Sequence, residues 1–159
     1  MKAKEGVMEI LNNILTSELT SINQYFIHGE MCEHWGYEQL HHKNRANAME
    51  EMRHSEGLIE HILYLEGVPN MQRLGTVNVG ETVPEQFKLD LKQEQDSAGK
   101  LNEAIAHCAK VGDNNTRHLL EKMLTEAEEQ IQWIETQLEA IRQIGLENYL
   151  SEQLKKEGS

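Results

Sequence analysis

Residues 66–85 read EGVPNMQRLGTVNVGETVPE, and this stretch decides how the rest of the chain folds. At its start, Gly67 and Pro69 end a helix, because glycine closes a helix well and proline forbids its continuation. Its last four residues, TVPE, have the form of a capping box with proline in the first turn, which predicts a new helix. Residues 70–81 between them lack a helical period. They predict a long connection, which lets the following helix run parallel to the preceding one.

Helical runs lie on both sides of this connection. Apolar residues recur at helical spacing in two runs before it and two after it, and a short fifth run follows Gly145. Two antiparallel helix pairs joined by one long crossover make an all-α four-helix bundle with a short last helix, in a single domain over residues 1–159. The expected helices cover residues 5–34, 38–65, 83–110, 114–144 and 147–156.

Composition excludes several classes of function. The net charge of -12 argues against a nucleic-acid partner, because binding phosphates requires a surplus of Lys and Arg. Cys32 and Cys108 lack CxxC spacing, which favours small buried side chains in a reducing compartment over a disulfide or a thiolate metal site. Residues 1–5 carry no signal-peptide pattern, and no apolar run is long enough to span a bilayer. We therefore expect a cytoplasmic protein without a membrane partner.

Three helices carry a glutamate on the face that should be buried. Glu18, Glu51 and Glu94 each lie within the apolar stripe of their helix, and His54 lies one turn after Glu51. Burial of an unpaired carboxylate costs several kcal/mol, so these groups require a partner. Each glutamate alone could be neutralised by a buried Lys or Arg, but the inward faces offer no obvious one. A shared metal ion explains the set better, and carboxylates with an imidazole suit iron.

The fourth helical run lacks the ligands that would complete a two-metal site. The di-iron carboxylate pattern of such bundles needs a second Glu-x-x-His pair, but the corresponding positions hold Ala127 and Gln130. Gln130 keeps only an amide oxygen, which makes it a weak candidate ligand. Glu126 and Glu128 flank Ala127, each rotated about 100° from the stripe, so we expect both to lie outside the reach of a central metal. The predicted site is one-sided.

Five short phrases are distributed over nearly the whole chain: SEL at 17–19, INQYF at 22–26, EMRH at 51–54, YLEGVPN at 64–70 and GLENYL at 145–150. Together they resemble the bacterioferritins, of the ferritin-like family. The resemblance implies a hollow shell of twenty-four subunits that oxidises ferrous iron within its bundles, stores the mineral in its cavity and receives electrons from a ferredoxin-type reductant. It also implies that Tyr25 lies beside the iron site, and that the ferroxidase centre is incomplete.

The same resemblance assigns a haem ligand. Position alone favours Met52 as packing filler, since methionine fills irregular gaps. Bacterioferritins, however, bind haem b between two subunits through this methionine from each, which implies a haem-bridged two-fold dimer. In the family, a His and an acidic residue in this region face the cavity of the shell and form an iron site on its inner surface. Ala46 and Glu50 depart from that pattern, so we do not expect such a site in this chain. The expected haem pocket consists of Leu19, Ile22, Asn23, Phe26 and Met49.

Three functions compete. The first is a haem-carrying storage subunit with a weak ferroxidase activity of its own, assembled with a second subunit type that has complete di-iron sites. The second is a self-sufficient ferroxidase that oxidises Fe(II) with O2 at a partial site of Glu18, Glu51, His54 and Glu94. The third is a DNA-protecting miniferritin, which is disfavoured by the short last helix, the ligands inside the bundle and the lack of a basic tail.

Overall fold

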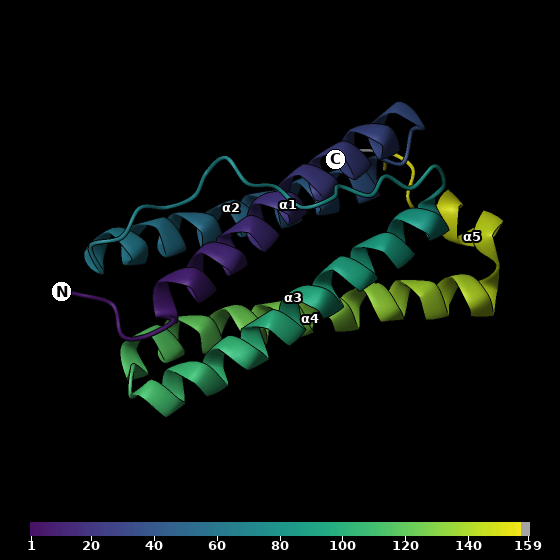
Figure 1. Ribbon diagram of the computed structural model, residues 1–159. Coiled ribbons are helices and arrows are strands. Elements are labelled where there is room, and N and C mark those ends of the chain that lie inside the picture. The colour runs from purple at the N-terminus through teal and green to yellow at the C-terminus, as the bar shows by residue number, and fades with distance from the viewer. Residues whose placement is uncertain (157–159) are drawn as a thin grey trace.

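The computed structural model describes residues 1–156, and within that part the chain forms helices and connecting segments without a strand (Figure 1). The observed architecture confirms the expected all-α bundle. A short last helix closes one end. The helices are α1 Val7–His34, α2 Glu38–Tyr64, α3 Val83–Val111, α4 Asn114–Ile144 and α5 Leu146–Ser151.

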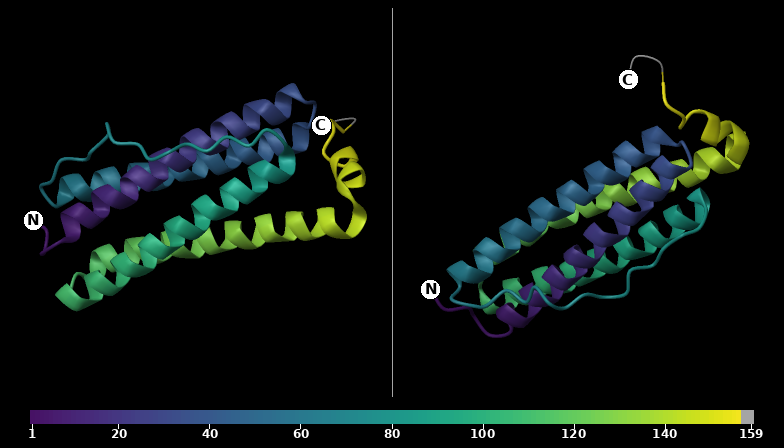
Figure 2. Two further views of the ribbon diagram at one scale, coloured as in Figure 1. Left: turned by 45° about the vertical axis from the view of Figure 1, so that its right-hand side comes forward. Right: turned by 90° about the horizontal axis from the view of Figure 1, so that it is seen from above.

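The long crossover sets the topology. α1 packs antiparallel to α2, and α3 packs antiparallel to α4, while α1 also packs against α3. Between the two pairs, residues 65–82 run back along the bundle beside α1, so that α3 starts at the end where α1 finishes (Figures 1 and 2). α3 consequently runs parallel to α2, as the sequence predicts.

Local chemistry explains where α3 and α4 begin. The Thr82 hydroxyl accepts a hydrogen bond from the Glu85 backbone N–H at 3.3 Å, which satisfies a free donor of the first turn. The Glu85 carboxylate accepts from the Glu81 N–H at 2.9 Å, just before the helix. Gly112 ends α3 with φ of 74°, a left-handed conformation that glycine adopts without strain. The Asp113 carboxylate then accepts from the Thr116 N–H and starts α4.

The structure differs from the predicted helix boundaries at five helix ends. α2 ends at Tyr64, not at residue 65, α3 ends at Val111, not at residue 110, and α5 begins at Leu146, not at residue 147. α1 begins at Val7, not at residue 5. α5 ends at Ser151, not at residue 156, because Leu154 stays 46% exposed and its burial cannot stabilise another turn. After α2 the left-handed residue is Glu66, with φ of 61°, and not Gly67. The Gly67 N–H still bonds to the Ile62 carbonyl at 2.9 Å, so the helix is closed as expected, one residue earlier.

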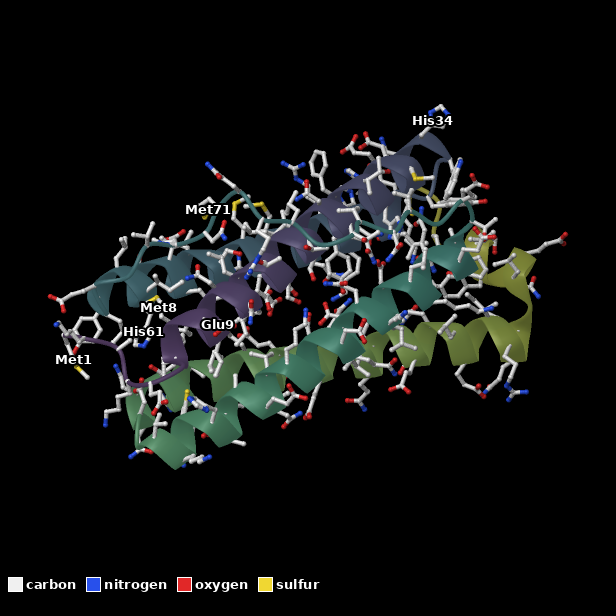
Figure 3. All side chains as sticks on the ribbon, viewed as in Figure 1. Met1, Met8, Glu9, His34, His61 and Met71 are labelled. Atoms are coloured by element: carbon white, nitrogen blue, oxygen red, sulfur yellow. The ribbon has the colours of Figure 1, made fainter. Side chains whose placement is uncertain are left out.

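The bundle core has two apolar clusters. One surrounds Leu11, Leu58 and Leu120, towards the end that carries Met1 and His61, and the other surrounds Cys32, Phe87 and Ile134, towards the end that carries His34 (Figure 3). Buried polar residues of α1, α2 and α3 lie between them along the helices, Glu18, Glu51 and Glu94 among them. The bundle centre is therefore polar. Within residues 1–156, no helix is both long and apolar enough to cross a bilayer.

Candidate metal centre

α1 and α2 bring three of the predicted ligands together. Ligand atoms of Glu18, Glu51 and His54 all lie within 4.8 Å of one another. His54 Nδ1 is 3.2 Å from Glu51 Oε2 and 3.5 Å from Glu18 Oε2, and the side chains of both glutamates are almost completely buried. The i, i+3 spacing on α2 places Glu51 and His54 on the same face of the helix.

α3 supplies the fourth predicted residue, Glu94. Its Oε1 atom accepts a 2.6 Å hydrogen bond from the Tyr25 hydroxyl, and the residue is 2% exposed. Burial and the neighbouring Glu51 carboxyl hold the pKa of Glu94 well above its usual range, although the Tyr25 bond acts in the opposite direction. Burial and the carboxylates of Glu94 and Asp90 likewise raise the pKa of Tyr25. Tyr25 thus lies beside the cluster of acidic groups.

Glu18 provides the clearest test of whether a cation fits here. It is 3% exposed, yet its Oε2 atom has no hydrogen-bond partner within residues 1–156. An unsatisfied buried carboxylate oxygen is costly, and a bound cation would remove that cost. The residues present therefore suit a hard divalent cation, with carboxylate oxygens and one imidazole nitrogen as donors.

α4 contacts this cluster through Glu126, which the sequence predicts to lie outside the reach of a central metal. The Oε2 atom of Glu126 contacts His54 Nε2, a contact that the sequence did not predict. Glu126 does not join the compact donor set of Glu18, Glu51 and His54. The backbones of α2 and α4 approach each other less closely than those of the helices within each pair. In this wider space a long side chain rotated from the core stripe still reaches across. Glu128, on the other side of Ala127, is exposed.

His54 consequently lies between carboxylates on both sides of its ring. Burial disfavours the charged imidazole, but the Glu51 and Glu126 carboxylates outweigh that effect and raise the pKa of His54 to about 9. The imidazole also borders a cavity of about 220 Å³ that opens towards solvent. The cavity is lined by Lys43, Asn47, Glu50, Glu51, His54, Glu126, Glu129, Gln130 and Trp133.

Ala127 and Gln130 are the two residues of α4 at the positions where a second Glu-x-x-His pair would lie. Ala127 is 7% exposed and joins an apolar cluster. Gln130 is half-buried, and its Nε2 atom has no hydrogen-bond partner within the described residues. α4 therefore presents a methyl group, an amide and the off-stripe Glu126 to the acidic cluster.

A second buried polar network was missed from the sequence. Asp90 is a further inward carboxylate, and its Oδ1 atom lies 2.9 Å from both Gln24 Nε2 and His28 Nδ1. His28 Nε2 accepts a 3.0 Å hydrogen bond from the Gly80 N–H of the crossover. This carboxylate is satisfied by protein groups and requires no metal. Its position four residues before Glu94 was a signal of burial that the sequence offered.

The residues expected to form the haem pocket belong to the middle parts of α1 and α2. Gly29 packs against Asn44, and Glu18 faces His54, so the intervening parts of α1 and α2 lie opposite each other. Within them, three large apolar side chains are exposed by 43–52%. These are Phe26, Met49 and Met52. Leu19 and Ile22 are half-buried beside them, and Asn23 is exposed, with its Nδ2 atom donating to the Leu19 carbonyl at 2.8 Å.

The chain matches known proteins over most of its length. The ferritin-like domain family matches residues 8–144. The chain is 43% identical over 149 residues to the bacterioferritin of Mycobacterium leprae, covering 94% of each chain. The chain belongs to the bacterioferritin family. It is equally similar to bacterioferritin BfrA of Mycobacterium tuberculosis, and it is 40% identical to the bacterial ferritin of Synechocystis over 97% of this chain and 99% of that protein.

Membership of the bacterioferritins supports a role in iron storage and self-assembly into an oligomer. Iron is then the cargo of the assembly, and the carboxylate and imidazole groups at the bundle centre have the donor chemistry to bind it.

Proposed function

We propose that this chain is a haem-carrying iron-storage subunit of a bacterioferritin-type shell that relies on a second, complete-site subunit for most of its iron oxidation. The observation that carries the proposal is the asymmetry of the bundle centre. Glu18, Glu51 and His54 form a compact donor set, whereas α4 presents Ala127 and Gln130 on its inward face.

This asymmetry has a direct chemical consequence. Two-metal sites work by holding both metals close enough to act on one oxidant, and each metal needs its own set of donors. Glu18, Glu51 and His54 provide such a set for one cation. Glu94 alone remains for the second, since Ala127 has no donor atom and Gln130 offers only an amide oxygen. The chain is therefore expected to bind a single iron firmly and to oxidise pairs of ferrous ions slowly.

The exposed apolar face supports the haem assignment. Large apolar side chains in water favour burial against a partner, and a two-fold dimer would place this face against its own copy. Met52 of each subunit would hold the haem iron, with Phe26 and Met49 packing against the ring. When bound, haem supplies one-electron transfer. That chemistry suits release of stored iron by a ferredoxin-type reductant.

A self-sufficient ferroxidase is the second candidate, and one contact favours it. Because Glu126 contacts His54, α4 does bring a carboxylate to the edge of the site. Carboxylates can change between terminal and bridging binding of a metal. The partial site could then turn over iron without a partner subunit.

Two measurements on the same material separate these functions. Subunit mass spectrometry and a visible spectrum of the native assembly should reveal a second ferritin-type chain together with haem. Ferrous oxidation by oxygen should be slow for shells of this chain alone and rapid for shells containing both chains. Homomeric native shells that oxidise iron as fast as a complete-site ferritin would refute the proposal in favour of the self-sufficient enzyme.

A further inference from the structure

The contact between His54 and Glu126 joins α2 to α4 at the edge of the acidic cluster. The two nitrogens of this imidazole have different surroundings. Nδ1 faces inward, towards the buried Glu18 and Glu51, while Nε2 faces Glu126, whose side chain is 43% exposed. The cavity that His54 borders is lined by Glu126 and also by Glu51, so the imidazole lies between the buried Glu18 and the side of the site that opens towards solvent.

A histidine that binds a metal uses one nitrogen as the ligand and donates the N–H of the other. A carboxylate that accepts this second bond fixes the tautomer, orients the ring and makes the ligand nitrogen more basic. Here the inward nitrogen is Nδ1 and the outward nitrogen is Nε2. Glu126 lies where the accepting carboxylate belongs.

We propose that Glu126 is a positioning residue for this centre, which accepts the Nε2 proton of His54 and so directs Nδ1 towards a divalent cation shared with Glu18 and Glu51. The inference rests on the proposed one-cation site and extends it. It gives α4 a role in that site through a residue next to Ala127, by supporting a ligand and not by supplying one.

A different arrangement uses the same atoms. Glu50, His54 and Glu126 also have donor atoms within 4.8 Å of one another, so a cation could lie between Nε2 and the two carboxylates, on the cavity side. The inward position is favoured because the unsatisfied Oε2 atom of Glu18 lies there, 3.5 Å from Nδ1. On the cavity side Lys43 also lines the space and brings a positive charge.

The first experiment locates the metal. Crystals of the assembled protein are soaked in Zn²⁺, a redox-inert probe, and anomalous diffraction is recorded at the zinc edge. We expect zinc bound to His54 Nδ1, Glu18 and Glu51, with Glu126 hydrogen-bonded to Nε2. Zinc between Nε2 and Glu126 would overturn the inference and leave the storage function intact. Absence of zinc from both positions would overturn the one-cation site itself, and the inference with it.

The second experiment measures what Glu126 contributes. Zinc affinity is determined by competition with a chromophoric chelator, and the relevant site is identified as the one lost in His54→Gln. Glu126→Ala should weaken this site by roughly 10- to 100-fold, the usual effect of removing a carboxylate behind a metal-binding histidine. Glu126→Asp should retain most of the affinity, because it preserves the charge and the acceptor.

Glu129→Ala is the matched control, since Glu129 lies on α4, lines the same cavity and is exposed. Its zinc affinity should equal that of the wild type. A proton competes with zinc for His54 Nδ1, and the negative charge of Glu126 favours binding of both. Because zinc carries two positive charges, Glu126 stabilises bound zinc more than a bound proton, so Glu126→Ala should still lower the zinc affinity. Equal losses in Glu126→Ala and Glu129→Ala would show a general charge effect and would refute the positioning role.

Discussion

The Tyr25 hydroxyl donates a 2.6 Å hydrogen bond to Glu94 Oε1 in a part of the bundle from which solvent is excluded. This bond joins α1 to α3 beside the acidic cluster. It also gives a buried carboxylate a partner that the sequence could not specify, since the two residues are 69 positions apart.

Tyr25→Phe should destabilise the metal-free protein. The change leaves Glu94 Oε1 without its donor, and an unsatisfied buried acceptor costs about 1–3 kcal/mol. Urea unfolding of the metal-free protein measures the loss. Tyr64→Phe is the matched control, because the Tyr64 hydroxyl is exposed and bonds only weakly to Met1 Sδ at 3.3 Å. Equal stabilities for the two variants would contradict the importance of the buried bond.

The pH dependence of stability should report on His54. Its pKa of about 9 in the folded chain exceeds the ordinary value of 6.5, so protonation favours the folded state. The stabilisation is fully present below pH 6.5 and is lost as the pH rises to 9. Its size is about 3 kcal/mol, from the shift in pKa.

His54→Gln should remove this loss of stability between pH 6.5 and 9, as measured by thermal unfolding of the metal-free protein at a series of pH values. His118→Gln, which changes an exposed histidine of α4, should leave the profile unchanged. A profile for His54→Gln that falls as steeply as that of the wild type would assign the effect to other groups.

Glu66→Gly should stabilise the chain. Glu66 holds the left-handed conformation after α2, with φ of 61°, which a residue with a Cβ adopts at a cost and glycine adopts freely. We expect a gain of about 1 kcal/mol in the free energy of unfolding, measured by urea titration. Glu66→Ala keeps the Cβ and controls for loss of the carboxylate. A Glu66→Gly variant less stable than Glu66→Ala would be inconsistent with backbone strain at this residue.

Met52→Leu should abolish haem binding, because leucine retains the apolar volume but has no sulfur to bind the haem iron. The visible absorbance of the purified assembly, divided by its protein content, measures haem occupancy. Met71→Leu is the control: Met71 lies on the crossover and is 53% exposed, close to the 47% of Met52 (Figure 3). Haem retained at the wild-type level in Met52→Leu would eliminate this methionine as the axial ligand.

Much of the architecture was predictable because its determinants are local. The helix-ending residues Gly67 and Pro69 and the capping box before α3 lie within one short stretch, and they specify the crossover. The inward positions of Glu18, Glu51 and Glu94 follow from helical periodicity alone. Local rules of this kind require no knowledge of which helices are neighbours.

The features that escaped prediction depend on distances between helices. Glu126 reaches His54 because α2 and α4 are widely spaced. A helical wheel gives no information on the distance between two helices. Asp90 has the same inward position as the three glutamates, but Gln24 and His28 satisfy it, so burial of a carboxylate did not by itself indicate a metal. Only the fold distinguishes the two cases.

The proposed function depends on the lack of metal ligands on the inward face of α4, and supplying those ligands tests it most directly. The double variant Ala127→Glu with Gln130→His supplies the Glu-x-x-His pair on α4, and stopped-flow oxidation of ferrous iron by oxygen compares it with the wild-type chain, each assembled alone. We predict a rapid phase that consumes a pair of ferrous ions per subunit in the double variant and no such phase in the wild type. A wild-type chain that already shows this phase, with the same rate and amplitude, would contradict the account.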